Sequence, residues 1–251
     1  TAEQLFKGFV EAAHRLGMRV VVEFVLRTAA KDSDWIPEHP EWFYWIRADV
    51  PDRMANIGRT GALNSYGQPI FSPDTLNLIF AKVNANDFHD LPPPPHQYRA
   101  MFTPPPRPDQ VRMEDGRYIG TLDDGTRVRI PGAFADWPPN DVQPPWSDVT
   151  YLRLYDHPDF NYMAYNTLRM YDAFLAQPEH RNAPLWERLI GIIPHYQKQF
   201  NIDGVLIDMG HALPMPLKQR IIATARATDP NFAFWDENFS IEWHTREQGY
   251  N

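Results

Sequence analysis

Three short apolar runs of the sequence carry polar side chains of the kinds that do acid, base or nucleophilic chemistry. These side chains are Glu23 and Arg27 at the first run, Asp208 after the second, and Asp236, Glu237 and Asn238 after the third. In a parallel α/β barrel the C-terminal ends of all strands open on one face, and that face holds the active site. A single carboxylate at such a place is more often a helix N-cap or part of a loop ion pair. Three at equivalent places favour a common site.

Asp208 and Glu237 have the arrangement expected of two catalytic carboxylates. Retaining glycosidases hold a nucleophile and an acid/base roughly 5–5.5 Å apart across the glycosidic bond, and adjacent strands lie about 4.8 Å apart. An ionised Asp208 would attack the anomeric carbon. Glu237, with its pKa raised by Trp235 and by Asp208, would protonate the leaving oxygen and then activate the acceptor. We expect the two carboxyl groups to lie within about 7 Å of each other.

The elements that position these residues alternate between helix and strand at both ends of the chain. Apolar residues at helical spacing predict the helices, and short β-branched runs predict buried strands. The expected elements are helices over 2–17, 184–200 and about 215–228, and strands over 18–25, 202–207 and 231–235. The last strand–helix–strand unit has the size of one βαβ repeat. The sequence therefore predicts an α/β fold with a parallel sheet.

The stretch between the two ends is rich in proline and interrupts this alternation. Thirteen of the 25 prolines fall within residues 91–146. Because proline lacks an amide donor, this stretch must consist of loops, turns and edge strands. Residues 118–122 and 126–130, joined by Asp-Asp-Gly, predict a β-hairpin. Interleaved aromatic residues favour a folded insertion over a disordered linker, and a helix is expected over 161–177.

Composition and charge exclude several classes of protein. The 251 residues carry a formal net charge of −8, which argues against a nucleic-acid binder. No apolar run could span a bilayer and no signal-peptide pattern opens the chain, so we expect a cytoplasmic protein with no membrane partner. Cysteine is absent and the nine histidines lack the clustering of a zinc site, so we expect no metal and no cofactor. The aromatic content of 14% suits a carbohydrate site or a large core, and composition alone favours the core.

Several short motifs, taken in their order and spacing, are specific enough to indicate a family. VVEFVLRT over 21–28 is followed by DGVLIDMGH over 203–211 and FWDEN over 234–238. Together they resemble the α-amylase family, glycoside hydrolase family 13. The maltosyltransferase branch is the most similar. Its marks are EHPEWF over 38–43, PWSDVTYLRL over 145–154 and NTLRMYD over 166–172.

The resemblance implies a fold and a division of the chain. The fold would be part of a (β/α)8 TIM barrel, strands 3 to 5, with a long Pro-rich domain B insertion. The implied divisions are a barrel segment over 1–45, the insertion over 46–160 and a second barrel segment over 161–251. We expect the chain to be a central slice of a longer enzyme, because the family places a third catalytic Asp after a later strand.

The resemblance also implies roles for individual residues. Asp208 would be the nucleophile and Glu237 the acid/base, as the spacing of the two carboxylates already suggested. The remaining expected substrate-site residues are His211 as a contact to sugar hydroxyls, Glu23 and Arg27 in support of the nucleophile, and Trp42 and Asn238 as further contacts. Consecutive aromatics such as those beside Trp42 are at least as often packing residues.

The implied reaction is retaining glycosyl transfer on an α-1,4-glucan or malto-oligosaccharide through a covalent glycosyl-Asp intermediate. Hydrolysis by an amylase-like relative is the close alternative, because the two reactions differ only in whether water or a sugar hydroxyl attacks the intermediate. Leu206 stands where the family has an Arg that orients the nucleophile. A catalytically impaired glucan-binding relative is therefore the alternative from another class.

Overall fold

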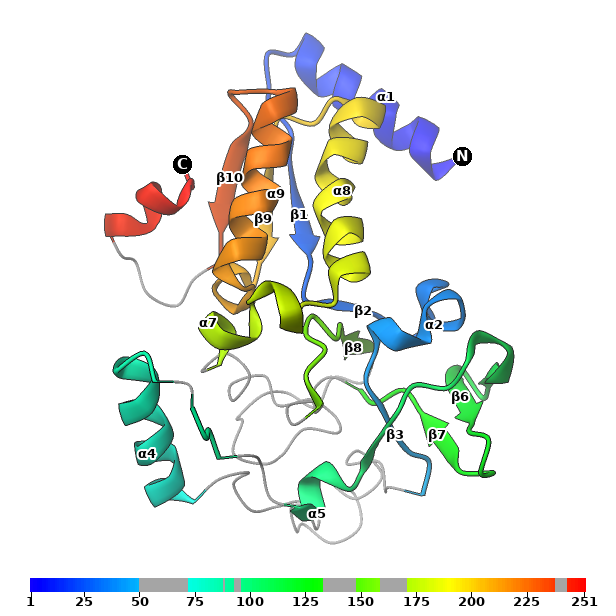
Figure 1. Cartoon of the computed structure of the whole chain (residues 1–251). Helices are drawn as coiled ribbons and strands as arrows, with labels where there is room; N and C mark the ends of the chain where they lie inside the picture. Colours follow the sequence, from blue (N-terminus) through cyan, green and yellow to red (C-terminus); the bar gives the residue numbers. More distant parts are fainter. Residues whose placement is uncertain (50–71, 88, 93–95, 133–147, 159–170, 238–242) are drawn as a thin grey trace, which may run out of the picture. The chain divides into compact units, whose positions relative to one another are not determined.

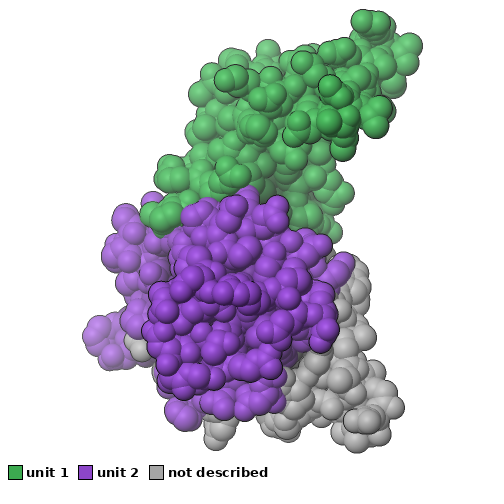
Figure 2. Space-filling view, turned by 90° about the vertical axis from the view of Figure 1, so that its right-hand side faces the viewer, with its two compact units in different colours: residues 1–27, 183–251 green, residues 28–182 purple. Residues whose placement is uncertain are grey.

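The computed structural model describes residues 1–49, 72–87, 89–92, 96–132, 148–158, 171–237 and 243–251 (Figure 1). The chain divides into two compact units, which are coloured separately in Figure 2. The first unit contains residues 1–27 and 183–251, and the second contains residues 28–182. The expected insertion over 46–160 lies within the second unit, and its relation to a family domain B stays a prediction.

A three-stranded parallel sheet forms the centre of the first unit. Its strands are β1 (Val21–Val25), β9 (Gly204–Asp208) and β10 (Ala233–Asp236), in the order β1-β9-β10. Its helices are α1 (Ala2–Arg15), α8 (Ala183–Phe200) and α9 (Met215–Thr228), with the 3-10 helices η5 (Gly210–Ala212) and η6 (Trp243–Gln248). Helix α8 leads into β9, and α9 connects β9 to β10 (Figure 1). The α/β fold is confirmed, whereas the place of these strands in a (β/α)8 barrel stays a prediction.

One face of this sheet packs against helices. Successive side chains of a strand point to opposite faces, and α8 and α9 lie along one of them (Figure 1). Phe24 of β1 meets Tyr196 of α8 edge-on, with ring centroids 4.8 Å apart. Val205 and Phe234, which are paired in the β9–β10 register, are fully buried. This face supplies the apolar core of the unit.

The opposite face carries the polar residues. The register aligns Glu23, Leu206 and Trp235 across the three strands, and Trp235 is 50% exposed. Asp208 follows Leu206 by two residues and Glu237 follows Trp235 by two. Because side chains alternate along a strand, both carboxyl-bearing residues project from this second face, at the C-terminal end of the sheet.

Asp203 ties the other end of the sheet together. Its Oδ2 accepts the Val20 amide N–H at 2.7 Å and lies 2.8 Å from His14 Nε2. The Asp203 amide in turn donates to the Val20 carbonyl at 2.9 Å. Arg19 adds an ion pair at 3.7 Å. One carboxylate therefore links the C-terminal end of α1 to the N-terminal ends of β1 and β9, at the end of the sheet opposite to Asp208.

The second unit is mainly antiparallel. A five-stranded sheet has the order β4-β3-β7-β6-β5, and β2 pairs with β8. The strands are β2 (Thr28–Ala30), β3 (Trp45–Arg47), β4 (Phe102–Thr103), β5 (Val111–Glu114), β6 (Arg117–Thr121), β7 (Arg127–Arg129) and β8 (Val149–Tyr151). The helices are α2 (Trp35–Glu38), η1 (Pro40–Trp42), α4 (Pro73–Asn84), α5 (His96–Arg99), η2 (Pro108–Gln110), α7 (Asp172–Leu175) and η4 (Pro178–His180).

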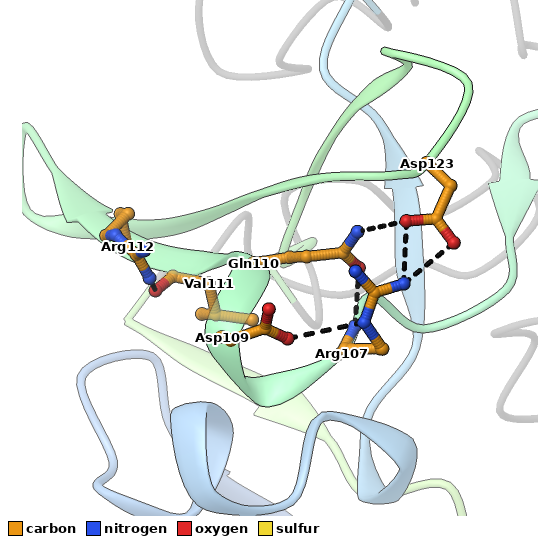
Figure 3. A network of polar contacts seen from close by, with 6 residues as sticks. All are labelled: Arg107, Asp109, Gln110, Val111, Arg112 and Asp123. Carbon is orange, nitrogen blue, oxygen red and sulfur yellow. Dashed lines mark hydrogen bonds and ion pairs between the residues drawn. The ribbon is translucent and has the colours of Figure 1, made fainter.

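The described part of the Pro-rich stretch is folded. The predicted hairpin is confirmed as β6 and β7, whose turn closes with the Leu122 amide donating to the Thr126 carbonyl at 2.9 Å. Figure 3 shows how this turn is held to η2. Arg107 Nη1 lies 2.6 and 2.7 Å from the two oxygens of Asp123, and Gln110 Nε2 donates to Asp123 at 2.8 Å (Figure 3).

Two further expectations are only partly covered by the described residues. The helix expected over 161–177 falls largely on residues 159–170, which lie outside the described residues, and α7 is its described part. Among the helices that the structure describes, none combines the length and the apolar character needed to cross a membrane.

Replacing Asp203 by Asn is expected to destabilise the first unit. The variant loses the charge that His14 and Arg19 contact and weakens the bond from the Val20 amide. We expect the free energy of unfolding to fall by about 1–3 kcal/mol. Urea unfolding of the full-length protein, followed by circular dichroism, measures this change.

The matched control is Glu187→Gln, which removes a carboxylate from the exposed ion pair with Arg220. This variant is expected to change the free energy of unfolding by less than about 1 kcal/mol. Equal losses in the two variants would contradict the role given to Asp203.

Candidate active site

Asp208 and Glu237 face each other at the C-terminal ends of β9 and β10. Their carboxyl groups lie close enough for a side-chain hydrogen bond between them to shift the pKa of each. The parallel register causes this: Ile207 pairs with Asp236, and the Glu237 amide donates to the Ile207 carbonyl at 3.0 Å. The ladder thus extends one residue beyond β10 and brings the two carboxyl groups side by side. The predicted proximity is confirmed, whereas the catalytic roles of both residues stay predictions.

The turn after Asp208 is wrapped around Glu237. Met209 has the left-handed conformation, with φ 47° and ψ 37°, which is uncommon for a residue with a side chain. In this conformation its amide donates to Glu237 Oε2 at 2.9 Å. His211 Nδ1 lies 3.0 Å from the Glu237 backbone carbonyl. A carbonyl can only accept, so Nδ1 carries the hydrogen.

The two carboxyl groups share one proton unequally. Burial, the hydrogen bond with Glu237, the charge of Glu237 and the charge of Glu23 together raise the pKa of Asp208 to about 6. The pKa of Glu237 is lowered, first by the Met209 amide, then by the bond with Asp208 and by the charge of His211. Below about pH 6, Asp208 therefore holds the proton and Glu237 is the anion.

The expected rise in the pKa of Glu237 is therefore wrong. That expectation relied on Trp235 to bury the carboxyl group and on Asp208 to repel a second charge. Trp235 is half exposed, and the Met209 amide stabilises the ionised form of Glu237. A hydrogen bond from a donor to a carboxylate favours its charged form. The more buried member of the pair, Asp208, takes the proton instead.

The surroundings of Asp208 contain more acid than base. Leu206, two residues earlier on the same face, is apolar, and Glu23 from β1 adds a like charge that raises the pKa of Asp208. Within the described part of the chain, no cation is among the groups that shift this pKa. Arg27 is buried, 2% exposed, directly beyond β1. Support of the nucleophile by Glu23 and Arg27 stays a prediction.

The other two expected contacts, Trp42 and Asn238, stay predictions. Trp42 belongs to the second unit and is only 5% exposed. The His39 ring stacks on it at 3.8 Å and the Trp35 ring meets it edge-on at 5.5 Å. Its surroundings are those of a packing residue, and its contact to sugar stays a prediction. Asn238 lies outside the described residues.

The sequence motifs did not predict two features of the turn that follows Asp208. One is the Met209 amide, which binds the Glu237 carboxylate. The other is Gly210, where a methyl group would come within 1.6 Å of Asp236 Oδ1. Glycine between Met209 and His211 was the available signal of a close approach. Across the described residues, no group of three or more His, Asp or Glu side chains could hold a metal ion.

Comparisons with known proteins bear on the family. No family model matches the chain. The alpha-1,4-glucan:maltose-1-phosphate maltosyltransferase of Cereibacter sphaeroides is 50% identical over 40 residues, which are 16% of this chain and 7% of that protein. Over this stretch the chain is similar to an enzyme of the α-amylase family. It spans less than a tenth of the curated maltosyltransferase that it matches.

Solved α-amylases are also similar to the chain. The α-amylase of Lactobacillus plantarum has a TM-score of 0.41 and 17% identity, over 98% of this chain and 31% of that chain. The α-amylase of Geobacillus thermoleovorans, complexed with acarbose, has a TM-score of 0.41 and 12% identity, over 99% of this chain and 33% of that chain. The chain thus spans about a third of each of these two α-amylases.

Glu237→Gln is expected to lower the pKa of Asp208. The variant removes the like charge of Glu237, and the amide of Gln can donate to an ionised Asp208, so two causes of the raised pKa disappear. Carboxyl carbon NMR of the full-length protein should show Asp208 titrating near pH 6 in the wild type and at clearly lower pH in the variant. Glu187→Gln is the control and should leave the titration of Asp208 unchanged. A variant midpoint at or above the wild-type value would contradict the shared proton.

Proposed function

We propose that the protein containing this chain transfers α-1,4-linked glucosyl units by retaining double displacement. Asp208 is the nucleophile and Glu237 the acid/base. The observation that supports this most is the hydrogen-bonded carboxyl pair at the C-terminal ends of two adjacent parallel strands. Two carboxyl groups in contact hold the single proton that this chemistry needs.

Substrate binding has to separate the pair and move its proton. A direct hydrogen bond is shorter than the roughly 5–5.5 Å at which a retaining pair works, so the Glu237 side chain must turn away as the sugar enters. The proton passes from Asp208 to Glu237 across the existing hydrogen bond. This leaves Asp208 ionised for attack and Glu237 protonated for donation, with no change in the total charge of the site.

Both steps of the reaction then use the same two residues. In the first, an Asp208 oxygen bonds to the anomeric carbon as the bond to the leaving group breaks, and Glu237 gives its proton to the leaving oxygen. In the second, Glu237 takes the proton of an acceptor hydroxyl, whose oxygen displaces Asp208 from the anomeric carbon. The leaving and entering groups lie on the same side, so the configuration is retained.

The donor class comes from the 40-residue likeness to maltosyltransferases. The name of that relative gives maltose 1-phosphate and an α-1,4-glucan as its substrates. We propose a maltosyl donor and a glucan acceptor for this protein, with His211 Nε2 as a contact to sugar hydroxyls. An amylase-like hydrolase would use the same residues with water as acceptor. Analysis of the products formed with and without added glucan separates the two reactions.

A glucan-binding protein without turnover is the second candidate, and one observation favours it. Leu206 provides no charge next to Asp208. The raised pKa of Asp208, the carboxyl that must attack, favours its protonated form. If the proton did not move on binding, the protein would hold glucan without reacting.

Asp208→Asn is expected to abolish transfer while leaving glucan binding measurable. Removing the nucleophile of a unit that acts together should reduce kcat by several orders of magnitude, on the order of 10⁴-fold or more. Transfer from a maltosyl donor to glucan in the full-length protein measures kcat, and calorimetry measures glucan binding. The matched control is Asp90→Asn, since the Asp90 side chain is 83% exposed, and it should keep normal turnover. Near-normal kcat in Asp208→Asn would mean that another residue is the nucleophile.

The Leu206→Arg variant distinguishes between the two candidate functions, glucan transfer and glucan binding without turnover. An Arg beneath Asp208 should lower the pKa of that carboxyl by roughly 1–3 units, because a cation favours its ionised form. For an enzyme, the acidic limb of the pH–rate profile should move to lower pH while kcat at neutral pH changes by less than about tenfold. Leu206→Met, which keeps an apolar side chain, is the control. A rise in kcat of several orders of magnitude on introducing Arg would identify the natural protein as a binding relative.

A further inference from the structure

Asp236, the residue before Glu237, carries a carboxylate that the proposed reaction does not use. Strand alternation places its side chain on the helix-covered face of the sheet, opposite to Glu237. Both of its oxygens are buried, and neither has a hydrogen-bond partner among the described residues. Burying a carboxylate without compensation is costly, so a nearby charge or donor is expected.

Lys218 and Tyr250 provide that compensation. Burial raises the pKa of Asp236, and the positive charge of Lys218, a residue of α9 that is 6% exposed, acts against this rise by favouring the ionised form. Its Nζ lies 5.8 Å from the centroid of the Tyr250 ring. The Tyr250 hydroxyl is also buried without a hydrogen-bond partner in the described part of the chain. Burial and the charge of Asp236 both raise the pKa of Tyr250.

These three side chains, Asp236, Lys218 and Tyr250, form one buried group that we call the Asp236 cluster. A hydroxyl donor and a carboxylate acceptor that are both buried without a hydrogen-bond partner are complementary. The backbone keeps Tyr250 in place, because the amide of Asn251 donates to the Phe234 carbonyl of β10 at 2.9 Å.

The Asp236 cluster touches the turn that wraps around Glu237. Asp236 Oδ1 lies so close to Gly210 that a Cβ there would be 1.6 Å away. Gly210 does not have a positive φ, so it is space and not backbone conformation that requires glycine. The next residue, His211, contacts the Glu237 carbonyl, and its charge also favours the ionised form of Asp236.

We propose that Asp236 is a positioning residue of the candidate active site. Its carboxylate, fixed by the Asp236 cluster, holds the turn at Gly210 in place against Glu237. The Met209 amide then stays on the Glu237 carboxylate, and His211 keeps its orientation. This inference deepens the proposed function, on which it rests.

The charge of Asp236 gives the proposal a second consequence. The charged and titratable groups that face Asp236 are Lys218 from α9, His211 from η5, Glu237 after β10 and Tyr250 from the segment after η6. Like charges repel, so an ionised Asp236 opposes ionisation of the Asp208–Glu237 pair. Removing this one charge should make the pair lose its shared proton at lower pH. Removing the positive charge of Lys218 as well should restore the balance of charge and return the titration midpoint of Asp208 most of the way to its wild-type value.

The test compares Asp236→Asn with the double variant Asp236→Asn/Lys218→Met in the full-length protein. Carboxyl carbon NMR reports the titration of Asp208, and amide hydrogen exchange reports the hydrogen bond of Met209. In Asp236→Asn the midpoint should fall by roughly 0.5–1 pH unit, and the Met209 amide should exchange at least about tenfold faster. The double variant should bring the midpoint back to within about 0.3 unit of the wild type. A purely structural role would make the double variant worse than the single one.

Asp229→Asn is the matched control, because Asp229 lies in the turn before β10 and accepts the Asn231 amide at the other end of the sheet. This variant should leave the titration midpoint of Asp208 and the exchange rate of the Met209 amide unchanged. A wild-type midpoint or a wild-type exchange rate in Asp236→Asn would overturn the proposal, and so would a double variant that is shifted further than the single one. Asn has the shape of Asp, and the NMR spectra show directly whether each variant is folded.

Measurements of turnover test the proposed transfer reaction and the positioning role of Asp236 separately. Asp236→Asn should lower kcat by roughly 10–100-fold while KM changes little, because the acid/base is misplaced and the sugar contacts are not. Absence of transfer in the wild type would count against the proposed function. Normal transfer in the wild type and in Asp236→Asn would count against the role of Asp236 alone.

Discussion

The parallel register of β9 with β10 is the constraint on which the site depends. It brings Asp208 and Glu237 to the same end and the same face of the sheet, and the bond from the Glu237 amide to the Ile207 carbonyl extends it by one residue. Two carboxyl groups in contact cannot both ionise easily, so they share one proton. The turn from Met209 to His211 then selects which group holds it, because its amide stabilises the Glu237 anion.

The distribution of charge around this pair follows from the two faces of the sheet. On the open face, Glu23, Asp208 and Glu237 lie with apolar Leu206 and half-exposed Trp235. On the helix face, the Asp236 cluster balances an anion with a buried lysine. The proposed reaction requires the shared proton to move from Asp208 to Glu237 when a sugar separates them. A site that holds one proton between two acids is prepared for this transfer without exchange with solvent.

Much of this arrangement could be predicted from sequence. The buried runs before Asp208 and Glu237 gave the strands, and strand spacing gave the proximity of the two carboxyl groups. Helix periodicity placed α8 and α9, and the Asp-Asp-Gly turn placed the hairpin of β6 and β7. These features depend on local pattern, which a single sequence contains.

Other features depend on contacts that pattern does not show. The pKa of Glu237 is set by the amide of Met209, whose left-handed conformation is not the common choice for a methionine. The motif leaves open whether Trp42 contacts substrate or packs inside the protein, and the fold shows that the rings of His39 and Trp35 pack against it. Gly210 could have indicated a close approach, but only the fold shows that Asp236 is what approaches it. The family motif drew attention to the acid/base and away from the residue before it.

The most direct test of the account is to trap the glycosyl-enzyme and find the modified residue. The full-length protein would be incubated with a fluorinated maltosyl fluoride that forms the covalent intermediate quickly and releases it slowly, and the peptides mapped by mass spectrometry. We predict a single ester-linked glycosyl group, formed on Asp208. Label on another carboxylate, or normal transfer with Asp208 never labelled, would contradict it.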